Sequence, residues 1–405
     1  MAAGGAAAAT CDADLVVVNT CSVTSSSDQG ARQIVRKIAR ENPGARIVVT
    51  GCYATRRPDE VGALPGVVQI VPNDRKEHLV AEIGLAAPKP EWAKAGLTTA
   101  ERFGDGEDAC GAALAPGLAG RTAFTLRVQT GCDQACSYCI IPTTRGSGRS
   151  RPMHEVLSEI ARVGDAGYRE IAITGVHLGS YGRDLGDGSS LLDLLTSIEQ
   201  QVRGIRFRIS SLEPMDCSDD IVDLVAASPW FAPHFHLPLQ HASDPMLVAM
   251  RRPYTLEYYR RLVDRIRRQL PHASIGTDII VGFPGESDDD FAVLESYLRE
   301  SPITHVHVFP YSDRPGTAAT ALPGKVHGSI VRDRASAVRA VGRELNRTFH
   351  EAQNGSVRPG LTIEDGSLVV TDNYLKVRIP PGHARNEWVS VRLATNGDGL
   401  GGAVV

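Results

Sequence analysis

The sequence predicts an α/β protein with an N-terminal parallel α/β layer, a central (β/α) barrel of TIM type and a small C-terminal β-barrel. Apolar strand-like runs alternate with amphipathic helical segments between residues 14 and 85, and again between residues 121 and 352. From residue 353 onward, only short β-prone runs remain, separated by Gly, Pro and Asn. A chain of 405 residues is long enough for two or three such domains.

The first segment, residues 1–85, has the alternation of a parallel sheet with helical crossovers. Its β-branched runs lie at residues 15–19, 47–50 and 67–71. Between the first two runs, apolar residues recur at helical spacing: Ala31, Ile34, Val35 and Ile38. Because parallel strands need crossover connections, we expect one three-stranded parallel layer here.

The central segment, residues 121–352, follows residues 86–120, whose lack of any sustained period predicts a linker. We expect strands at 124–129, 170–174, 205–210, 234–238, 275–281 and 304–309. We expect amphipathic helices at 153–166, 190–202, 218–227, 255–269, 288–300 and 327–351. Repeated βα units of this kind predict a parallel barrel, either closed or open.

The last segment, residues 353–405, predicts a small antiparallel β-barrel. Its short strands are expected at 361–363, 367–371, 375–379 and 389–393. Gly, Pro and Asn between them supply the turns that such a module needs.

Composition excludes several classes of protein. Hydrophobic residues at 42% and charged residues at 22% are typical of an ordinary globular chain. No run approaches the roughly 18 apolar residues of a membrane-spanning helix. The opening residues 1–10 lack the charged region and apolar core of a signal peptide. We therefore expect a cytoplasmic protein that makes no membrane contact.

The charge pattern leaves two interpretations open. A net charge of −4 gives no general sign of nucleic-acid binding. Seven arginines nevertheless gather between residues 251 and 268. They either meet phosphates or form the solvated face of a helix.

Cys132, Cys136 and Cys139 form the most informative motif, with C-x3-C-x2-C spacing directly after an apolar strand. Eight cysteines in a chain expected in the cytoplasm indicate metal or redox chemistry rather than disulfides. Electron-transfer clusters usually have four cysteine ligands, so three thiolates predict a 4Fe–4S cluster with one open iron that binds a ligand and reacts. A zinc site that lacks one ligand is the alternative.

A second pair, Cys21 and Cys52, follows the ends of the first two N-terminal strands. The carboxyl ends of parallel strands lie along one edge of a sheet, where ligand crevices form. The two thiols are thus expected either to converge on one site or to be small buried hydrophobes.

Together these motifs resemble the methylthiotransferases, a family of radical S-adenosylmethionine (radical SAM) enzymes. Two examples are Asn-Thr-Cys-Ser-Val-Thr at residues 19–24 and Asp-Ile-Ile-Val-Gly-Phe-Pro-Gly-Glu at residues 278–286. Further matching stretches lie at 50–54, 128–144, 147–152, 174–182, 210–214, 236–240 and 309–317. Residues 177–182 and 371–377 resemble the branch that acts on N6-threonylcarbamoyladenosine in tRNA, and the tail resembles a TRAM domain, an RNA-contacting β-barrel.

The resemblance implies two 4Fe–4S clusters and S-adenosylmethionine as cofactors. In this family, one cluster generates an adenosyl radical that removes hydrogen from C2 of the hypermodified adenosine beside the anticodon. The other cluster delivers the methylthio group. Acid–base catalysis cannot activate such an unpolarised C–H bond, which explains the use of a radical. The implied partners are tRNA and an electron donor such as flavodoxin or ferredoxin.

The resemblance also implies roles for individual residues. Cys132, Cys136 and Cys139 are the expected catalytic ligands of the radical cluster, and Cys21 and Cys52 are expected ligands of the auxiliary cluster. The expected contacts to S-adenosylmethionine are Tyr138, Thr174, Gly175, Glu213 and Gln240. Tyr138 is alternatively a loop packing residue, and Thr174 with Gly175 is alternatively a simple turn. The expected contacts to RNA are Arg145, Arg149, Arg151, Lys376 and Arg378.

In the family, a third auxiliary cysteine lies in a Gly-Cys segment upstream of the position of Cys21. The chain as printed starts too late to contain it, so we expect a truncated N-terminal layer that lacks one strand and one ligand. Cys11 is the alternative third ligand, although it precedes a strand instead of following one.

Three competing hypotheses remain. In the first, the enzyme acts on isopentenyladenosine tRNA or on a ribosomal protein. In the second, the chain is a paralogue without a complete auxiliary cluster. In the third, the chain is a non-catalytic RNA-binding protein whose cysteines hold a structural metal. Structural zinc sites have four protein ligands, and the three cysteines of the motif therefore argue against this hypothesis.

Overall fold

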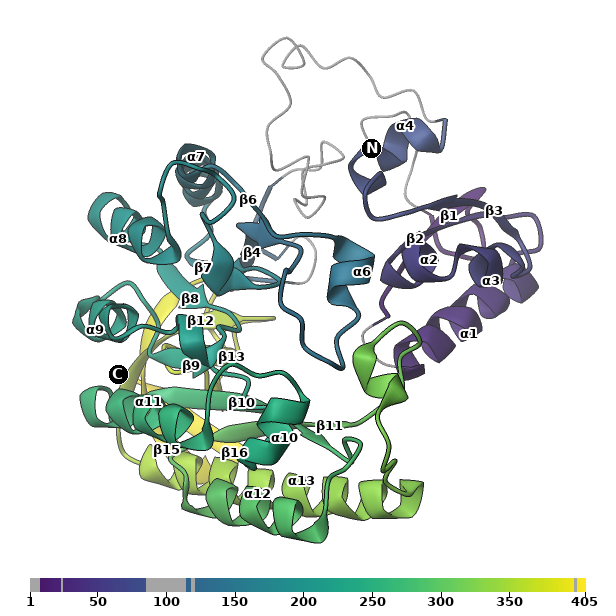
Figure 1. The fold of residues 1–405 in the computed structure, drawn as a ribbon. Coiled ribbons are helices and arrows are strands. Elements are labelled where there is room, and N and C mark those ends of the chain that lie inside the picture. The colour runs from purple at the N-terminus through teal and green to yellow at the C-terminus, as the bar shows by residue number, and fades with distance from the viewer. Residues whose placement is uncertain (1–7, 23–24, 85–113, 118–120, 397–398) are drawn as a thin grey trace.

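The computed structural model describes residues 8–22, 25–84, 114–117, 121–396 and 399–405. The elements form an N-terminal layer, a central barrel and a small C-terminal barrel (Figure 1). The fold class predicted from the sequence is thereby confirmed. Most of the predicted linker at 86–120 lies outside the described residues.

The N-terminal layer is a three-stranded parallel sheet in the order β1-β2-β3. Its strands are β1 (Leu15–Thr20), β2 (Arg46–Gly51) and β3 (Val67–Val71). Its helices are α1 (Ser25–Glu41), α2 (Cys52–Arg56), α3 (Pro58–Gly62), η1 (Lys76–His78) and α4 (Leu79–Glu82). The apolar face of α1 packs through Val35 and Ile38 against Ile47 and Val49 of β2, so burial holds the layer together.

The central barrel is the open form of the predicted βα repeat. One parallel sheet contains β4 (Phe124–Arg127), β7 (Glu170–Thr174) and β8 (Arg206–Ile209). The other contains β9 (His234–His236), β10 (Ser274–Val281) and β11 (His305–Pro310). An isolated bridge joins Phe207 of β8 to Phe231, which lies just before β9. Among the described strands, β4 and β11 are the outer ones, so the barrel does not close by hydrogen bonds.

Helices cover the outside of these strands (Figure 1). They are α7 (Met153–Asp165), α8 (Leu191–Gln201), α9 (Asp219–Ala227), α11 (Leu256–Gln269), α12 (Asp288–Glu300) and α13 (Gly328–Ala352). Ser190 and Ser287 start α8 and α12 with capping boxes, which explains why these helices begin where they do. Ile171, Ile275 and Ile279 belong to the single large core between strands and helices.

Short elements connect the barrel units and carry much of the site. They are β5 (Gln129–Thr130), α6 (Ile141–Arg145), β6 (Arg149–Ser150), η3 (Leu178–Ser180), η4 (Pro214–Asp216), α10 (Asp244–Ala249) and η5 (Ala318–Ala321). The sequence did not predict them, because such short segments are too brief to show a period.

The C-terminal strands close into a barrel in the order β12-β13-β14-β16-β15. They are β12 (Val357–Ile363), β13 (Leu368–Thr371), β14 (Lys376–Arg378), β15 (Trp388–Asn396) and β16 (Gly399–Val404). The glycine-rich β16 was not predicted, since it lacks apolar alternation. A Cβ atom on Gly402 would lie 2.4 Å from Cγ1 of Val391, so the small residue is required for closure.

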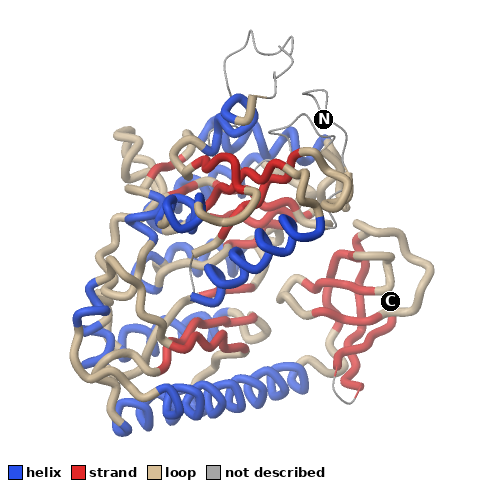
Figure 2. Tube along the Cα trace, turned by 90° about the vertical axis from the view of Figure 1, so that its right-hand side faces the viewer, coloured by secondary structure: helices blue, strands red, loops and turns tan. Residues whose placement is uncertain are grey.

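This small barrel stands beside the central one (Figure 2) and contacts the amino ends of its strands. Nη1 of Arg206, at the start of β8, donates to the Pro359 carbonyl oxygen at 3.4 Å. Nδ2 of Asn373 donates to the carbonyl oxygen of His272, just before β10, at 2.9 Å. The searched helices of the described chain include none that is long and apolar enough to cross a membrane.

Candidate active site

The loop of Cys132, Cys136 and Cys139 is held by backbone hydrogen bonds at its start and in its middle. The Cys132 N–H donates to the Gly146 carbonyl oxygen at 3.0 Å. The Ser137 N–H donates to the Met250 carbonyl oxygen at 3.1 Å. Gly131 has φ 72°, and a Cβ atom there would lie 1.9 Å from the Ser147 carbonyl oxygen, so only glycine fits. The loop therefore presents its thiols from a fixed backbone.

The three thiols suit an iron–sulfur cluster. All are free of disulfides, and each sulfur accepts a hydrogen bond. The donors are Gln134 N–H to Cys132, Ile141 N–H to Cys139 and Arg252 Nη1 to Cys136, at 3.4, 3.5 and 3.1 Å. Burial raises the pKa of Cys136, and it raises that of Cys139 to about 11. Binding of a metal must therefore release protons from these thiols.

Arg252 is buried, unlike most arginines in the run from 251 to 268. Its side chain is 1% exposed and forms an ion pair with Glu213, while Nε donates to the Tyr254 hydroxyl at 3.0 Å. Arg260, Arg261 and Arg268 are exposed, which both the solvated-face and the phosphate interpretation of α11 allow. Arg252 instead joins Cys136 to Glu213 and supports the thiolate charge.

The other residues predicted to contact S-adenosylmethionine lie near this loop or at strand ends. Tyr138 packs against the apolar cluster that contains Met250 and Phe283. Thr174 ends β7, and a Cβ atom on the following Gly175 would lie 3.0 Å from Cα of Leu178.

Gln240 follows β9 with a left-handed φ of 71°. Its N–H donates to the Asp278 carbonyl oxygen at 2.8 Å. Its carbonyl oxygen accepts from the Ile280 N–H, also at 2.8 Å, so the residue is pinned to β10. The roles of these residues in binding the cofactor stay predictions.

Gln129 is a positioning residue that the sequence analysis missed. Its side chain is fully buried, and Oε1 accepts from the backbone N–H groups of Val176 and His177 at 3.0 and 2.8 Å. Its Nε2 donates to the Gly131 carbonyl oxygen at 3.0 Å. It thereby connects the cysteine loop to the loop after β7. A polar residue in an apolar strand just before the triad is the signal that could have found it.

His177 lies beside the same loop. Its Nε2 is 2.7 Å from Oδ2 of Asp216. Burial lowers the pKa of His177, but interactions with Asp216 and Cys132 outweigh burial and raise it to about 9. Both interactions favour the protonated imidazole.

Cys21 and Cys52 line one cavity of about 630 Å³ between the N-terminal layer and the barrel. Gly51 has φ 98°, and a Cβ atom there would lie 2.2 Å from the Thr20 carbonyl oxygen, so the ends of β1 and β2 approach closely. Nδ2 of Asn73 donates to Cys52 Sγ at 3.5 Å. The strand-end argument thus placed the two thiols correctly at a shared cavity.

Cys11 does not line this cavity. It is exposed, and its Sγ donates to Oδ2 of Asp12 at 3.4 Å. The prediction that Arg151 contacts phosphate is wrong. Arg151 is only 3% exposed. Its backbone N–H donates to the Val128 carbonyl oxygen, and its carbonyl oxygen accepts from the Tyr181 hydroxyl, so the residue is held in the interior. Arg149, by contrast, is exposed, and Arg145 is half-buried.

A buried carboxylate joins the N-terminal layer to the barrel. Asp28 of α1 accepts from the Ser22 hydroxyl at 2.7 Å and pairs with Arg56. It also accepts from Nη1 of Arg314, in the loop after β11, at 2.9 Å. Ser22, Asp28 and Arg314 are buried, and the Arg56 side chain is 9% exposed. The two sides of the 630 Å³ cavity are therefore held together by charge.

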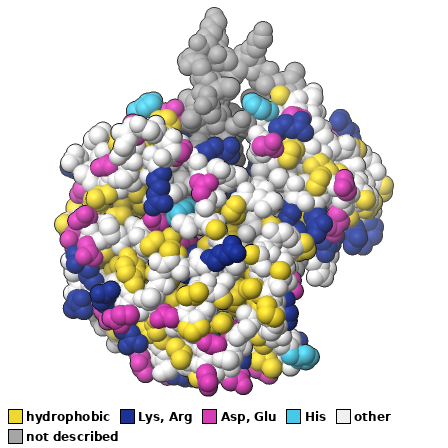
Figure 3. Space-filling model, in the orientation of Figure 1, with side chains coloured by type: hydrophobic (Ala, Val, Ile, Leu, Met, Phe, Trp, Pro, Cys, Tyr) yellow, Lys and Arg dark blue, Asp and Glu magenta, His cyan; other side chains and the backbone are white. Residues whose placement is uncertain are grey.

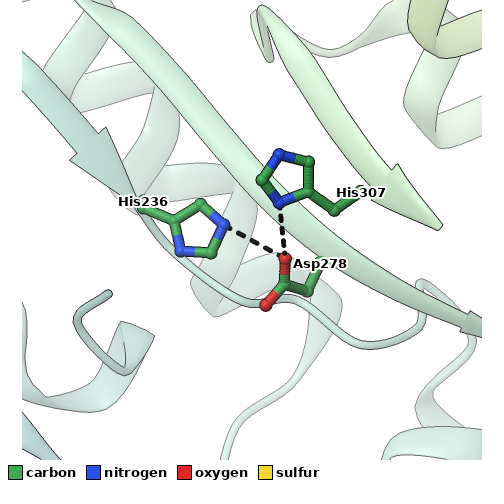
Figure 4. Close-up of side chains that lie close together, drawn as sticks. All are labelled: His236, Asp278 and His307. Atoms are coloured by element: carbon green, nitrogen blue, oxygen red, sulfur yellow. Dashed lines mark hydrogen bonds and ion pairs between the residues drawn. The ribbon is translucent and has the colours of Figure 1, made fainter. Parts of the chain in front are cut away.

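Histidines of the second sheet line a cavity of about 590 Å³ that residues of the C-terminal barrel also line. Nε2 of His236 and Nδ1 of His307 lie 3.1 and 3.2 Å from the same oxygen of Asp278 (Figure 4). Their ligand atoms lie within 4.8 Å of one another, but hydrogen bonding alone accounts for the arrangement. Burial raises the pKa of Asp278. The hydrogen bonds from His236 and His307 outweigh burial and lower this pKa to about 2. Burial and two neighbouring histidines lower the pKa of His305 to about 4.

His305 is expected to make the protein less stable in mild acid. Between pH 6.5 and about 4, the unfolded histidine binds a proton that the folded one does not. Stability therefore falls as pH drops through this window, by up to roughly 3 kcal/mol. His305→Gln should remove this loss, as measured by chemical denaturation at several pH values.

His307→Gln is the matched control. The hydrogen bond to Asp278 raises the pKa of His307, so its contribution is present below pH 6.5 and fades as pH rises. This variant should therefore be less stable than the unchanged protein mainly in acid, whereas His305→Gln should be more stable there. A His305→Gln profile parallel to that of the unchanged protein contradicts the assignment.

Two family models match the chain. The one described as "Radical SAM superfamily" matches residues 126–298, and the one described as "Uncharacterized protein family UPF0004" matches residues 4–72. These ranges contain the triad and the pair Cys21 and Cys52, respectively.

Curated relatives cover most of the chain. The threonylcarbamoyladenosine tRNA methylthiotransferase MtaB of Bacillus subtilis is 34% identical over 376 residues, which is 90% of this chain and 82% of that protein. The protein of the same name from Aquifex aeolicus is 35% identical over 367 residues, covering 90% and 87%. A tRNA-2-methylthio-N(6)-dimethylallyladenosine synthase of Streptomyces viridosporus is 32% identical over 375 residues, covering 91% and 73%.

Among solved structures, the radical S-adenosylmethionine methyltransferase TsrM from Kitasatospora setae has a similar fold. The TM-score is 0.54 at 16% identity, over 76% of this chain and 64% of that one. At this identity, the likeness supports the fold alone.

Proposed function

The chain belongs to the radical SAM methylthiotransferase family, and from that premise we propose that it transfers a methylthio group to C2 of N6-threonylcarbamoyladenosine in tRNA. The observation that carries the reaction class is the shared cavity, which has Cys21 and Cys52 on one side and the loops around the triad on the other. The choice of nucleoside rests on relatives named for it that are 31% to 35% identical.

Cys132, Cys136 and Cys139 are the proposed ligands of the radical cluster. When bound, the cluster and S-adenosylmethionine supply the radical that C2 requires. The chain's own groups position the loop and its charge: Gln129 fixes the backbone, and Arg252 donates to Cys136. The proposed contacts to S-adenosylmethionine remain Tyr138, Thr174, Gly175, Glu213 and Gln240.

Cys21 and Cys52 are the proposed ligands of a second 4Fe–4S cluster on the sulfur-donating side. Because the base must be within reach of both groups, we place it in the shared cavity. We assign residues 1–85 to the sulfur-donating domain, 121–352 to the radical domain and 353–405 to RNA contact. Lys376 and Arg378 are exposed on β14 and available to phosphates. Flavodoxin or ferredoxin is the proposed electron donor.

Nucleoside mass spectrometry of tRNA tests the proposal. A strain without this gene should lose the methylthio mark on threonylcarbamoyladenosine and keep it on isopentenyladenosine. Expression of this chain should restore the mark if Cys21 and Cys52, together with other ligands, are enough to hold the second cluster. If the mark persists in the deletion strain, the substrate assignment is wrong. If the mark is instead lost from isopentenyladenosine, the other branch is correct.

A further inference from the structure

A buried arginine side chain makes a hydrogen bond to one sulfur of the triad. Nη1 of Arg252 donates to Cys136 Sγ at 3.1 Å, whereas backbone N–H groups donate to the other two sulfurs. A guanidinium stays charged at every physiological pH, and this one is 1% exposed, so water screens it little. The sulfur of Cys136 therefore has a positive charge at hydrogen-bond distance.

The turn that carries Arg252 is bound to the cysteine loop by hydrogen bonds. The Ser137 hydroxyl donates to the Ala249 carbonyl oxygen at 2.8 Å, and the Ser137 N–H donates to the Met250 carbonyl oxygen at 3.1 Å. The Arg252 N–H donates to the Leu247 carbonyl oxygen at 2.8 Å, just beyond the end of α10. The backbone on both sides of the contact is thus fixed, and the guanidinium is held beside the sulfur.

The other two nitrogens of the guanidinium also have acceptors. Nε donates to the Tyr254 hydroxyl at 3.0 Å, and this hydroxyl donates to the Pro238 carbonyl oxygen at 2.9 Å. Nη2 pairs with the carboxylate of Glu213. Because the Glu213 side chain is 23% exposed, water weakens the field of its carboxylate more than it weakens that of Arg252. The pair therefore leaves a net positive field at the sulfur.

Charges on the surface are expected to have a smaller effect at this sulfur. Acidic and basic side chains are intermixed over the central barrel on the face that Figure 3 shows. Water and salt screen such charges over distances of about 10 Å. Arg251, the neighbour of Arg252 in the chain, is exposed. Of these two arginines, the buried one is therefore expected to dominate the field.

We propose that Arg252 is a positioning residue that raises the reduction potential of the radical cluster, and that Glu213 opposes it. The inference rests on the proposed function, since it requires a cluster on the triad. Reduction passes one electron from the donor to the cluster, and no bond or proton is exchanged. A charged hydrogen-bond donor at a ligand sulfur stabilises the added negative charge, so it favours the reduced form.

The test is an anaerobic redox titration of the reconstituted holoenzyme, followed by EPR spectroscopy in the absence of S-adenosylmethionine. The signal that is missing from Cys132→Ala identifies the radical cluster. Arg252→Gln should lower the equilibrium constant for its reduction about tenfold, which corresponds to about 59 mV for one electron. Arg252→Lys keeps the charge and should shift the potential less. Glu213→Gln removes the opposing charge and should raise the potential.

Arg251→Gln is the matched control, since it removes the same charge from the exposed neighbour, and it should leave the potential unchanged. Shifts of opposite sign in Arg252→Gln and Glu213→Gln support the proposal, because loosening of the site would act in the same direction in both. An unchanged potential in Arg252→Gln, or shifts of the same sign, would overturn it. So would an equal shift in Arg251→Gln, which would show a general effect of charge. If Arg252→Gln holds no cluster, the proposal requires Arg252→Lys to lower the potential and Glu213→Gln to raise it.

Iron content and turnover separate this inference from the proposed function. If the triad holds its cluster and the unchanged protein methylthiolates tRNA, but the potentials do not shift, the inference fails while the reaction stands. If the potentials shift as expected but no tRNA is methylthiolated, the proposed reaction fails while the role of Arg252 stands. If Cys132→Ala loses no iron, the triad holds no cluster and both fail.

Discussion

Cys132→Ala is expected to lower the iron content of the anaerobically reconstituted protein from about eight to about four atoms per chain. It should also abolish cleavage of S-adenosylmethionine and methylthiolation. All three cysteines of the triad are proposed ligands, and each sulfur accepts a hydrogen bond from a donor of its own. Iron and sulfide analysis, together with detection of 5′-deoxyadenosine, measures both effects.

Two other cysteines provide the controls. Cys217→Ala changes a buried thiol of the barrel core and should keep the full iron content. Cys52→Ala should also reduce iron to about four atoms, but cleavage of S-adenosylmethionine should continue. If the unchanged protein holds only about four irons and Cys132→Ala holds almost none, the second cluster does not assemble on this chain.

Asp28→Ala is expected to separate the N-terminal layer from the barrel. The substitution leaves Arg56 and Arg314 buried without their shared carboxylate, which costs roughly 3–5 kcal/mol. Methylthiolation should be lost, while the triad continues to cleave S-adenosylmethionine without transfer. Hydrogen exchange in α1 and the ratio of 5′-deoxyadenosine to product measure the two consequences.

Glu60→Ala is the matched control for this prediction. Glu60 pairs with Arg32 at 3.0 Å, but both side chains are partly exposed, so its loss costs about 1 kcal/mol or less. Coupling between cleavage and transfer should remain normal. An Asp28→Ala protein that keeps normal coupling and normal exchange would falsify the idea that this carboxylate holds the two parts together.

Periodicity predicted the long elements well because their burial is one-sided. The segment expected to be helical at 288–300 is α12 with the same bounds, and the strand expected at 170–174 is β7. The glycine-rich β16 was missed, since pairing with β15 rather than its own side chains makes it a strand. Propensity cannot show a strand of that kind.

The site was predictable where local spacing encodes it. Cysteines spaced along one loop, or placed at strand ends, show their association in the sequence. Arg252 and Glu213 are 39 residues apart, and Arg314 and Asp28 are 286 apart. No local pattern records such pairs, because only the packed barrel brings them together. The same limit explains Arg151, which looked accessible in sequence and is buried.

The C-terminal barrel sits at the amino ends of the central strands, whereas the triad follows the carboxyl end of β4. The wall between them is as tall as its strands, and the eight residues of β10 span roughly 26 Å. An RNA that touches β14 while its base lies at the triad must reach over that wall, which a free nucleoside is too short to do. In the proposed function, RNA contact at β14 and reaction of the base at the triad therefore lie on different sides of the central strands.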